Sequence, residues 1–340
     1  MDTGSSSLFS RTVLFISAVF INAKKSYIRC TFIYVVLSAL AACGTVPSSE
    51  TAELEESVEK EIANFIEFPL QEVTTLANSG IIPPKNKYGA DGISVSEDGN
   101  VFISGGPLTN SVVRITSEGV VSEFASGFES ANGSDFDSKG NLFVADYAAN
   151  MIRRISHNGT VSTFASGLDG PAGVYVDEED NVIVGLYGAN YSGKGATVLR
   201  ISPNGESTVL ATGGGLRDVI GVVGDENGEL YAGNYKGRQL FRITDGTVEQ
   251  VGISSVKINM IDYSRGHIYI ANMGRIVRIN ILTGEEELFA GTPEPKTING
   301  PVESADFVMP TSLAFSPDGN ILYVVDRITG DVRKIGPKEP

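Results

Sequence analysis

The segment 132–168 constrains the fold more than any other part of the chain. It divides into four short strands, SDFD, NLFVAD, MIRRI and VSTFAS, with turns at Lys139-Gly140 and Asn158-Gly159. Short strands with alternating side chains, joined by Gly and Asn turns, predict a small antiparallel meander. One such sheet cannot bury both of its faces, so it needs copies of itself on either side.

The copies are present along the chain. When the first turn of each unit is aligned, equivalent positions fall 38 to 53 residues apart, at Gly99, Gly140, Asp180, Gly228, Gly266 and Gly319. The third strand of each unit carries a basic residue just before an isoleucine, at Arg114, Arg154, Arg200, Arg242, Arg278 and Lys334. Four strands repeated with a period near 40 residues predict a β-propeller.

The two ends of the repeat array complement each other. The sixth unit has three strands before Pro340, whereas segment 73–78 (VTTLAN) matches the fourth-strand pattern with no unit before it. We expect this N-terminal strand to complete the last blade, which leaves no free sheet edge in the ring. The predicted fold is therefore all-β: a six-bladed β-propeller over residues 65–340, with four-stranded antiparallel blades.

Residues 1–42 have the parts of an export signal. Lys24, Lys25 and Arg29 precede an apolar run over residues 31–40, which ends in Leu-Ala-Ala-Cys. This ending resembles the lipobox of bacterial lipoproteins, which implies that Cys43 is lipidated and becomes the mature N-terminus. The alternatives are an ordinary signal peptide or a membrane anchor, although the run is shorter than the ~20 residues that a spanning helix needs.

The predicted location follows from this signal. An acylated Cys43 would tether the protein to a lipid membrane of the cell envelope, at the outer membrane or the periplasmic face in a Gram-negative cell. Residues 43–64 are polar and rich in glutamate, which predicts a solvated tether between the lipid and the propeller.

Composition limits the partners. The net charge of −15 repels phosphate backbones, so nucleic acid is not expected to bind. The second cysteine, Cys30, lies in the predicted signal, which leaves no pair for a disulfide. We expect a monomer.

The repeat resembles a known type. The sequence from Asn141 to Ile155, followed by Phe-Ala-Ser-Gly, is similar to the NHL repeat and to the related superfamily of gluconolactonases and senescence-marker protein. The resemblance covers residues 71–340. It implies the six-bladed propeller, but these propellers include lactonases, esterases, lyases and binding proteins without catalytic activity.

Strand order predicts which residues surround the mouth of the channel. The start of the first strand and the end of the second strand of each blade meet at one face. Residues just beyond the second strands there form an expected ligand-binding rim, made of Tyr147, Tyr187, Tyr235, Asp146, Asn234, Asn272, Asp326 and Arg327. Three tyrosines on consecutive blades beside amides and carboxylates suit a ligand or an envelope partner, although tyrosines also commonly cap blade edges.

Catalysis has fewer candidates. Both histidines, His157 and His267, fall in turns at the opposite face, so a Ser-His-Asp site at the mouth is not expected. The starts of the innermost strands supply Asp91 and Asn132, which could hold a divalent cation such as calcium and take the catalytic role. The resemblance implies Glu, Asn and Asp ligands in gluconolactonase-like propellers, and the remaining aligned positions here are Ala172, Ile220, Ile258 and Thr311.

Three functions are left open by the sequence. The favoured interpretation is an exported, lipid-anchored propeller that binds a ligand or protein partner on the channel-mouth face. The alternatives are a metal-dependent lactonase or esterase that uses Asp91 and Asn132, and a structural scaffold of the envelope.

Overall fold

The computed structural model describes residues 71–81, 89–105 and 110–338. They belong to one compact unit. All regular elements in these residues are β-strands, and none of the described residues forms a helix long and apolar enough to cross a membrane. The predicted signal peptide, the predicted lipidation site Cys43 and the predicted acidic tether lie outside the described residues.

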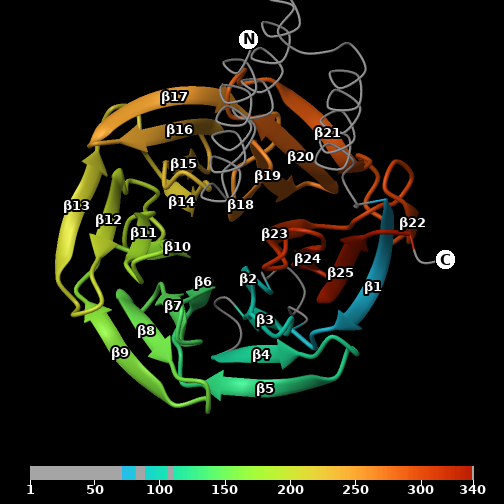
Figure 1. Ribbon diagram of the computed structural model, residues 1–340, viewed down its shortest axis with the longest axis horizontal. Helices are drawn as coiled ribbons and strands as arrows, with labels where there is room; N and C mark the ends of the chain where they lie inside the picture. The colour runs from blue at the N-terminus through green and yellow to red at the C-terminus, as the bar shows by residue number, and fades with distance from the viewer. Residues whose placement is uncertain (1–70, 82–88, 106–109, 339–340) are drawn as a thin grey trace, which may run out of the picture. The chain divides into compact units, whose positions relative to one another are not determined.

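The strands form six sheets arranged as a ring around a central axis (Figure 1). Blade 1 contains β2 (Gly92–Val95), β3 (Val101–Ser104), β4 (Ser111–Ile115) and β5 (Val121–Ser126). Blade 2 contains β6 (Ala131–Phe136), β7 (Leu142–Asp146), β8 (Met151–Ile155) and β9 (Val161–Ser166). Blade 3 contains β10 (Pro171–Val176), β11 (Val182–Leu186), β12 (Thr197–Ile201) and β13 (Ser207–Thr212).

The second half of the ring has the same order. Blade 4 contains β14 (Val219–Gly224), β15 (Leu230–Asn234), β16 (Gln239–Thr244) and β17 (Thr247–Ile253). Blade 5 contains β18 (Ile261–Ser264), β19 (His267–Asn272), β20 (Arg275–Asn280) and β21 (Glu286–Gly291). Blade 6 contains β23 (Pro310–Phe315), β24 (Leu322–Asp326), β25 (Asp331–Gly336) and, from the start of the chain, β1 (Glu72–Asn78).

The predicted ring closure is confirmed. β1 pairs antiparallel with β25 from Glu72 opposite Gly336 to Asn78 opposite Asp331, with one irregularity between Thr75 and Ala77. Figure 1 shows the blue N-terminal strand beside the red C-terminal strand. The ends of the described chain are therefore held in a single sheet, and both the all-β class and the six four-stranded blades are as predicted.

Blade 6 has one strand that the sequence did not predict. β22 (Gly300–Pro301) pairs with the outer edge of β1 at Glu72 and Val73, so this sheet has five strands. It comes from the long connection between β21 and β23. Because β1 closes the ring, a short strand over its outer edge also protects the closure from foreign pairing.

The hydrophobic core lies between neighbouring blades. The second strands β7, β11, β15 and β24 are buried along their whole length, because a blade covers each of their faces. The fourth strands are mostly exposed; β5, for example, is buried only at Ala125. This gradient from inner to outer strand is expected for sheets stacked around an axis.

Glycine recurs in the innermost strands because neighbouring blades approach very closely there. A Cβ on Gly92 would lie 2.2 Å from the carbonyl oxygen of Asn132, and one on Gly173 would lie 1.9 Å from that of Ile220. A larger residue at either position would push two blades apart at the axis.

The closure can be tested on the buried face of β1. Val73 has no exposed surface and packs in a core cluster with Ile335 and Tyr269. We expect Val73→Ala to lower the free energy of unfolding by about 1–3 kcal/mol. Thr74→Ala, which changes an exposed neighbour, should cost less than about 0.5 kcal/mol. Urea unfolding of the two variants measures the difference, and equal stability would contradict the closing role of β1.

Candidate functional site

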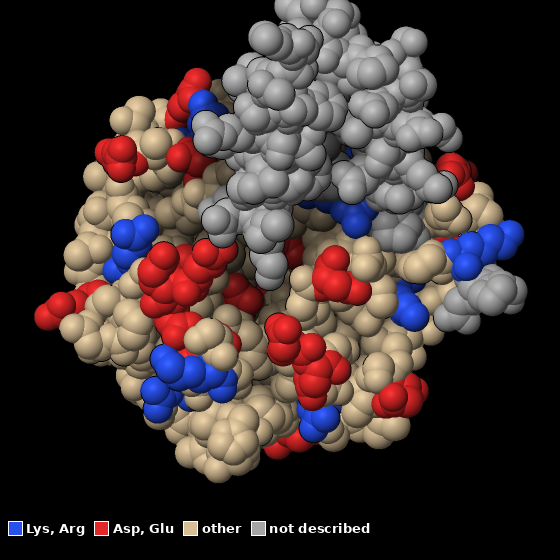
Figure 2. Space-filling model, in the orientation of Figure 1, with Lys and Arg blue, Asp and Glu red and all other residues tan. Residues whose placement is uncertain are grey.

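The two ends of the propeller differ in charge. The turns between the first and second strands hold acidic residues, namely Glu97, Asp98, Asp137, Asp177, Glu178, Glu179, Asp180, Asp225, Glu226 and Asp318. Figure 2 shows a face on which Asp and Glu side chains gather around the central hollow. Both histidines also lie at the end opposite the mouth, His157 in the turn between β8 and β9 and His267 at the start of β19.

The loops at the mouth of blades 3 to 5 are basic instead. Five exposed cations stand on them, namely Lys194, Arg217, Lys236, Arg238 and Lys257. None of these five forms an ion pair with a carboxylate of the described residues. The whole chain has a net charge of −15, whereas this part of its surface is positively charged and therefore attracts anions.

The three predicted tyrosines lie together at this mouth. The ring of Tyr187 lies 6.3 Å from that of Tyr147 and 6.2 Å from that of Tyr235, measured between centroids. Lys257 Nζ lies over the ring of Tyr235 at 5.2 Å from its centroid. Tyr187 and Tyr235 are half-buried, so each keeps part of its ring accessible. The strands of blades 2, 3 and 4 thus deliver one continuous aromatic row.

Tyr147 is buried beside this aromatic row and stabilises the loop next to it. Its side chain is 2 % exposed, its hydroxyl donates to the carbonyl of Gly188 at 2.6 Å, and it accepts from the amide of Tyr191 at 2.6 Å. Burial raises the pKa of Tyr147 to about 12. These contacts fix the loop between β11 and β12, and they leave Tyr147 little surface for a ligand.

Tyr191 is a rim residue that the sequence analysis did not single out. Its ring is 57 % exposed and lies 4.5 Å from the ring of Tyr147. Asn190 and Tyr191 both have positive φ, at 55° and 56°, a conformation that a bulky side chain rarely adopts. The only signal in the sequence was the length of the loop. We define the tyrosine rim as Tyr187, Tyr191 and Tyr235.

The four predicted acid and amide residues of the rim are buried and bonded to backbone. Asp146 accepts from the amides of Glu129 and Ser130, and Asp326 accepts from those of Val308 and Met309. The two asparagines form corresponding hydrogen bonds in the opposite direction. The side-chain amide of Asn234 donates to the carbonyl of Gly215, and that of Asn272 donates to the carbonyl of Lys257. Each side chain ties the end of a second strand to the loop that enters the same blade.

Asp91 and Asn132, the predicted metal and catalytic residues, lie on adjacent blades, Asp91 just before β2 and Asn132 within β6. The carboxylate of Asp91 forms an ion pair with Arg327 across the seam between blades 1 and 6. The side-chain oxygen of Asn132 accepts from Ser130 Oγ at 3.1 Å. Calcium takes six to eight oxygen ligands. Two side chains, one of them already paired with arginine, do not fit that need.

The structure corrects the predicted alignment in blade 5. Gly92, Gly133, Gly173 and Gly221 each meet a carbonyl of the next blade, and for Gly221 that carbonyl belongs to Asn259. Asn259, and not Ile258, is therefore the equivalent of Asn132. The hairpin Ser264–His267 is one residue shorter than its counterparts, which shifts the count back from the turn. Even with Asn259, no three His, Cys, Asp or Glu side chains of the described residues converge as a metal site.

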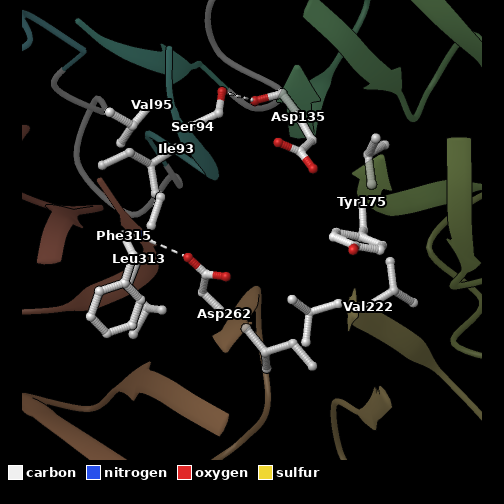
Figure 3. Close-up of a pocket in the computed structure, with 14 residues that line it drawn as sticks. Ile93, Ser94, Val95, Asp135, Tyr175, Val222, Asp262, Leu313 and Phe315 are labelled. Carbon is white, nitrogen blue, oxygen red and sulfur yellow. Dashed lines mark hydrogen bonds between the residues drawn. The ribbon is translucent and has the colours of Figure 1, made fainter. Parts of the chain in front are cut away.

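The channel below the mouth contains two further carboxylates. Asp135 of β6 and Asp262 of β18 come from opposite blades and point into the same space, a cavity of about 100 Å³ (Figure 3). Asp135 accepts from the amides of Phe136 and Val176 at 2.8 Å each, and Asp262 accepts from those of Tyr263 and Phe315. Each aspartate thus bonds to an innermost strand of the following blade.

Burial controls the protonation of this pair. It raises the pKa of Asp135 to about 7 and that of Asp262 to about 6, and the charge of Asp262 adds to the effect on Asp135. Removal of a carboxylate from water disfavours its charged form, and here the backbone amides only partly compensate. The sequence analysis missed both residues. They occupy the same position of the innermost strand, three residues after Asn132 and Asn259, and the alignment to Ile258 hid this equivalence.

Comparison with solved structures confirms the fold and its breadth of use. A streptogramin B lyase superposes with a TM-score of 0.56 at 17% identity, over 79% of this chain and 98% of the other. A gluconolactonase from Xanthomonas campestris gives 0.60 at 13% identity, over 78% and 89%. An auxiliary nutrient binding protein from Bacteroides thetaiotaomicron gives 0.63 at 14% identity, over 79% and 77%.

At these identities the likeness extends to the fold alone. No protein-family model matches the chain, and no curated protein matches it. The chain therefore has the six-bladed propeller architecture that gluconolactonase-like proteins and streptogramin lyases share, which the repeat pattern had predicted. The named activities differ from one another, so the architecture by itself selects none of them.

The channel pair makes stability depend on pH. Asp135 and Asp262 have folded pKa values above the ordinary 3.8, so the folded state binds more protons than the unfolded state between about pH 4 and 7. Their contribution to stability is therefore lost as pH rises through that window. We expect the fall in melting temperature from pH 5 to pH 8 to be smaller in Asp135→Asn than in wild type. The difference should be about 2–4 °C or more, because one pKa unit corresponds to about 1.4 kcal/mol.

Calorimetry at the two pH values measures this difference. Glu206→Gln, a change of an exposed carboxylate, is the control and should keep the wild-type slope. A wild-type slope in Asp135→Asn would contradict the assignment of the raised pKa to the channel.

The mouth can be tested for a metal. Because Asp91 is paired with Arg327, we expect a chelator to leave the melting temperature of the propeller unchanged, and calcium to raise it by less than about 1 °C. Metal analysis of the purified protein should accompany the melting curves. One divalent ion per chain together with a lower melting temperature in chelator would contradict this expectation and favour the lactonase alternative.

Proposed function

We propose that this protein is an exported, lipid-anchored propeller that binds an anionic ligand, or an anionic surface of a partner, at its tyrosine rim. The single observation that carries the proposal is the row of Tyr187, Tyr191 and Tyr235, flanked by cations that form no ion pair with a carboxylate of the described residues. Tyrosine offers a large contact area with a polar end and loses little conformational freedom on binding. A flanking lysine selects negative charge.

Lys236 and Tyr187 lie close together at the rim. A Cβ on Gly193 would lie 3.1 Å from Lys236 Nζ and 3.2 Å from Tyr187 Oη, so the ammonium and the hydroxyl stand beside the same glycine. On the other side of the row, Lys257 lies over Tyr235. A ligand on the rim would therefore meet aromatic faces and two ammonium groups together.

The loop that carries Tyr191 is held in place before any ligand arrives. The amide of Ala189 donates to Asp169 Oδ1 at 2.8 Å, and the amide of Gly195 donates to the carbonyl of Tyr187 at 2.9 Å. Together with the hydrogen bond from the amide of Tyr191 to Tyr147 Oη, these contacts hold Tyr191 in its left-handed backbone conformation with its ring exposed. Strain of this kind costs about 1–3 kcal/mol and is often retained at binding sites. A preformed loop also reduces the entropy lost on binding.

The remaining parts of the proposal come from the sequence and from similar folds. Export and acylation of Cys43 rest on the basic and apolar segment before Leu-Ala-Ala-Cys. A binding role is in line with the nutrient binding protein among the similar structures. Because gluconolactonases are also among the similar structures, lactone hydrolysis is the second candidate function. Asp91, Asn132 and Asn259 would then be the residues of the active site.

Adsorption to an immobilised anionic polysaccharide tests the rim. Although the calculated pI is about 4.6, we expect the protein to bind heparin resin weakly at neutral pH and low salt, through the mouth face. Lys236→Ala combined with Lys257→Ala should abolish retention. Tyr187→Ala should weaken retention about threefold to tenfold and change the melting temperature by less than about 2 °C, since the ring is only half-buried.

Lys139→Ala provides the matched control, because Lys139 lies in a turn at the acidic end and pairs with Asp180 at 2.9 Å. It should leave retention unchanged. Wild-type protein in the flow-through, or equal losses from Lys139→Ala and from the rim variants, would contradict an anion-selective rim. A large loss of stability in Tyr187→Ala would show that this ring belongs to the core.

A further inference from the structure

A second pocket lies at the other end of the propeller, away from the tyrosine rim. It is a groove of about 700 Å³ beside blades 1 and 2, bordered by turns that include Glu97 and His157. Its wall contains Phe102, Phe124 and Phe136, whose rings meet edge to face at 4.9 and 5.1 Å. The volume is within the range of small-molecule sites. Beside the aromatic wall the groove is lined by polar and charged side chains, among them Glu97, Asp98 and Arg114.

Arg114 also lines this groove. It stands between Phe102 and Ser122 on adjacent strands, and its buried Nε has no hydrogen-bond partner. In blade 5 the equivalent Arg278 stands between Tyr269 and Glu287 and binds both. Blade 1 thus keeps the arginine of the repeat but has phenylalanine and serine where blade 5 has tyrosine and glutamate, so neither neighbour supplies a carboxylate.

Blade 2 has the same pair of neighbours around its arginine, but this arginine does not line the groove. Arg154 stands between Phe143 and Ser162, again without a carboxylate partner. Its side chain is exposed, so water can solvate it. Arg114 differs because its side chain is only partly exposed and lines the groove. No carboxylate of the described residues forms an ion pair with it, so its guanidinium can pair with an anionic group in the groove.

The carboxylates of the groove are not equivalent. Asp98 accepts from Ser96 and Asn100, Asp137 accepts from the amide and side chain of Asn141, and Asp135 is bonded to backbone. Glu97 is exposed and has no such partner among the described residues. It forms no ion pair with Arg114 either. The groove therefore presents one cation and one anion that do not satisfy each other, with phenylalanine rings beside them.

We infer that this groove binds an α-amino acid with an aromatic side chain. The carboxylate of the ligand would bind Arg114, its ammonium would face Glu97, and its ring would contact Phe102, Phe124 and Phe136. A simple anion would be repelled by the surrounding carboxylates, and a simple cation would leave Arg114 unsatisfied. A zwitterion with an apolar side chain meets all three features at once.

Calorimetric titration of the full-length protein with L-phenylalanine tests the inference. We expect saturable binding, and about tenfold weaker binding of phenylacetate, which lacks the ammonium, and of phenethylamine, which lacks the carboxylate. Ser122→Glu would give Arg114 the internal partner that Arg278 already has. It should weaken L-phenylalanine binding at least about tenfold while it preserves or raises the melting temperature.

Ser162→Glu makes the same change in blade 2 and is the matched control, with no expected effect on binding. Glu97→Gln should weaken L-phenylalanine about threefold to tenfold and leave phenylacetate unaffected or improved. The inference is overturned by the absence of saturable binding at millimolar L-phenylalanine, by equal affinity for phenylacetate, or by equal effects of Ser122→Glu and Ser162→Glu. None of these variants touches the tyrosine rim, so the outcome is independent of the proposed rim function.

Discussion

The pairing of β1 with β25 is the contact on which the rest of the structure depends. It joins residues separated by more than 250 positions, and it converts a row of sheets into a ring without free inner edges. Only in a closed ring do the second strands gain a blade on each side. The narrow channel, the seam between Asp91 and Arg327, and the opposed positions of Asp135 and Asp262 all require that closure.

Repetition and departure from repetition separate structural from functional residues in this fold. The aspartates and asparagines at the ends of the second strands recur from blade to blade, and each ties a strand to its entry loop. The candidate sites consist of exceptions. Tyr191 occupies an extended loop, and Arg114 keeps a repeated arginine after its partners have changed. Candidate functional residues of a propeller can therefore be found by comparing each blade with the others.

The sequence was sufficient for the architecture because a propeller is specified many times over. Six copies of one strand pattern predicted the blades, and the unmatched strand before the first unit predicted the closure. The site was harder to predict. Asp146 and Tyr147 are adjacent in sequence and stand at the mouth, but burial of both depends on loops that no local pattern describes. In blade 5 a hairpin shorter by one residue moved Asn259 into the position assigned to Ile258.

Charge gives the two ends of the molecule different chemistry. The acidic turns keep an already acidic protein soluble and exclude simple anions, while the mouth of blades 3 to 5 attracts them. A propeller with such an asymmetry can present one face to an anionic ligand and hold the other face away from it. The tyrosine rim then adds contact area where charge alone would not discriminate.

The central claim is that the mouth face, and not the opposite end of blade 5, contacts the anionic ligand of the rim. It is tested most directly by placing a photo-reactive phenylalanine analogue at position 187, at position 235, or at the exposed Leu282 of blade 5, and irradiating cells that produce the protein. The account predicts the same cross-linked species from positions 187 and 235 and none from position 282. Equal cross-linking from all three positions, or none from the rim, would contradict it.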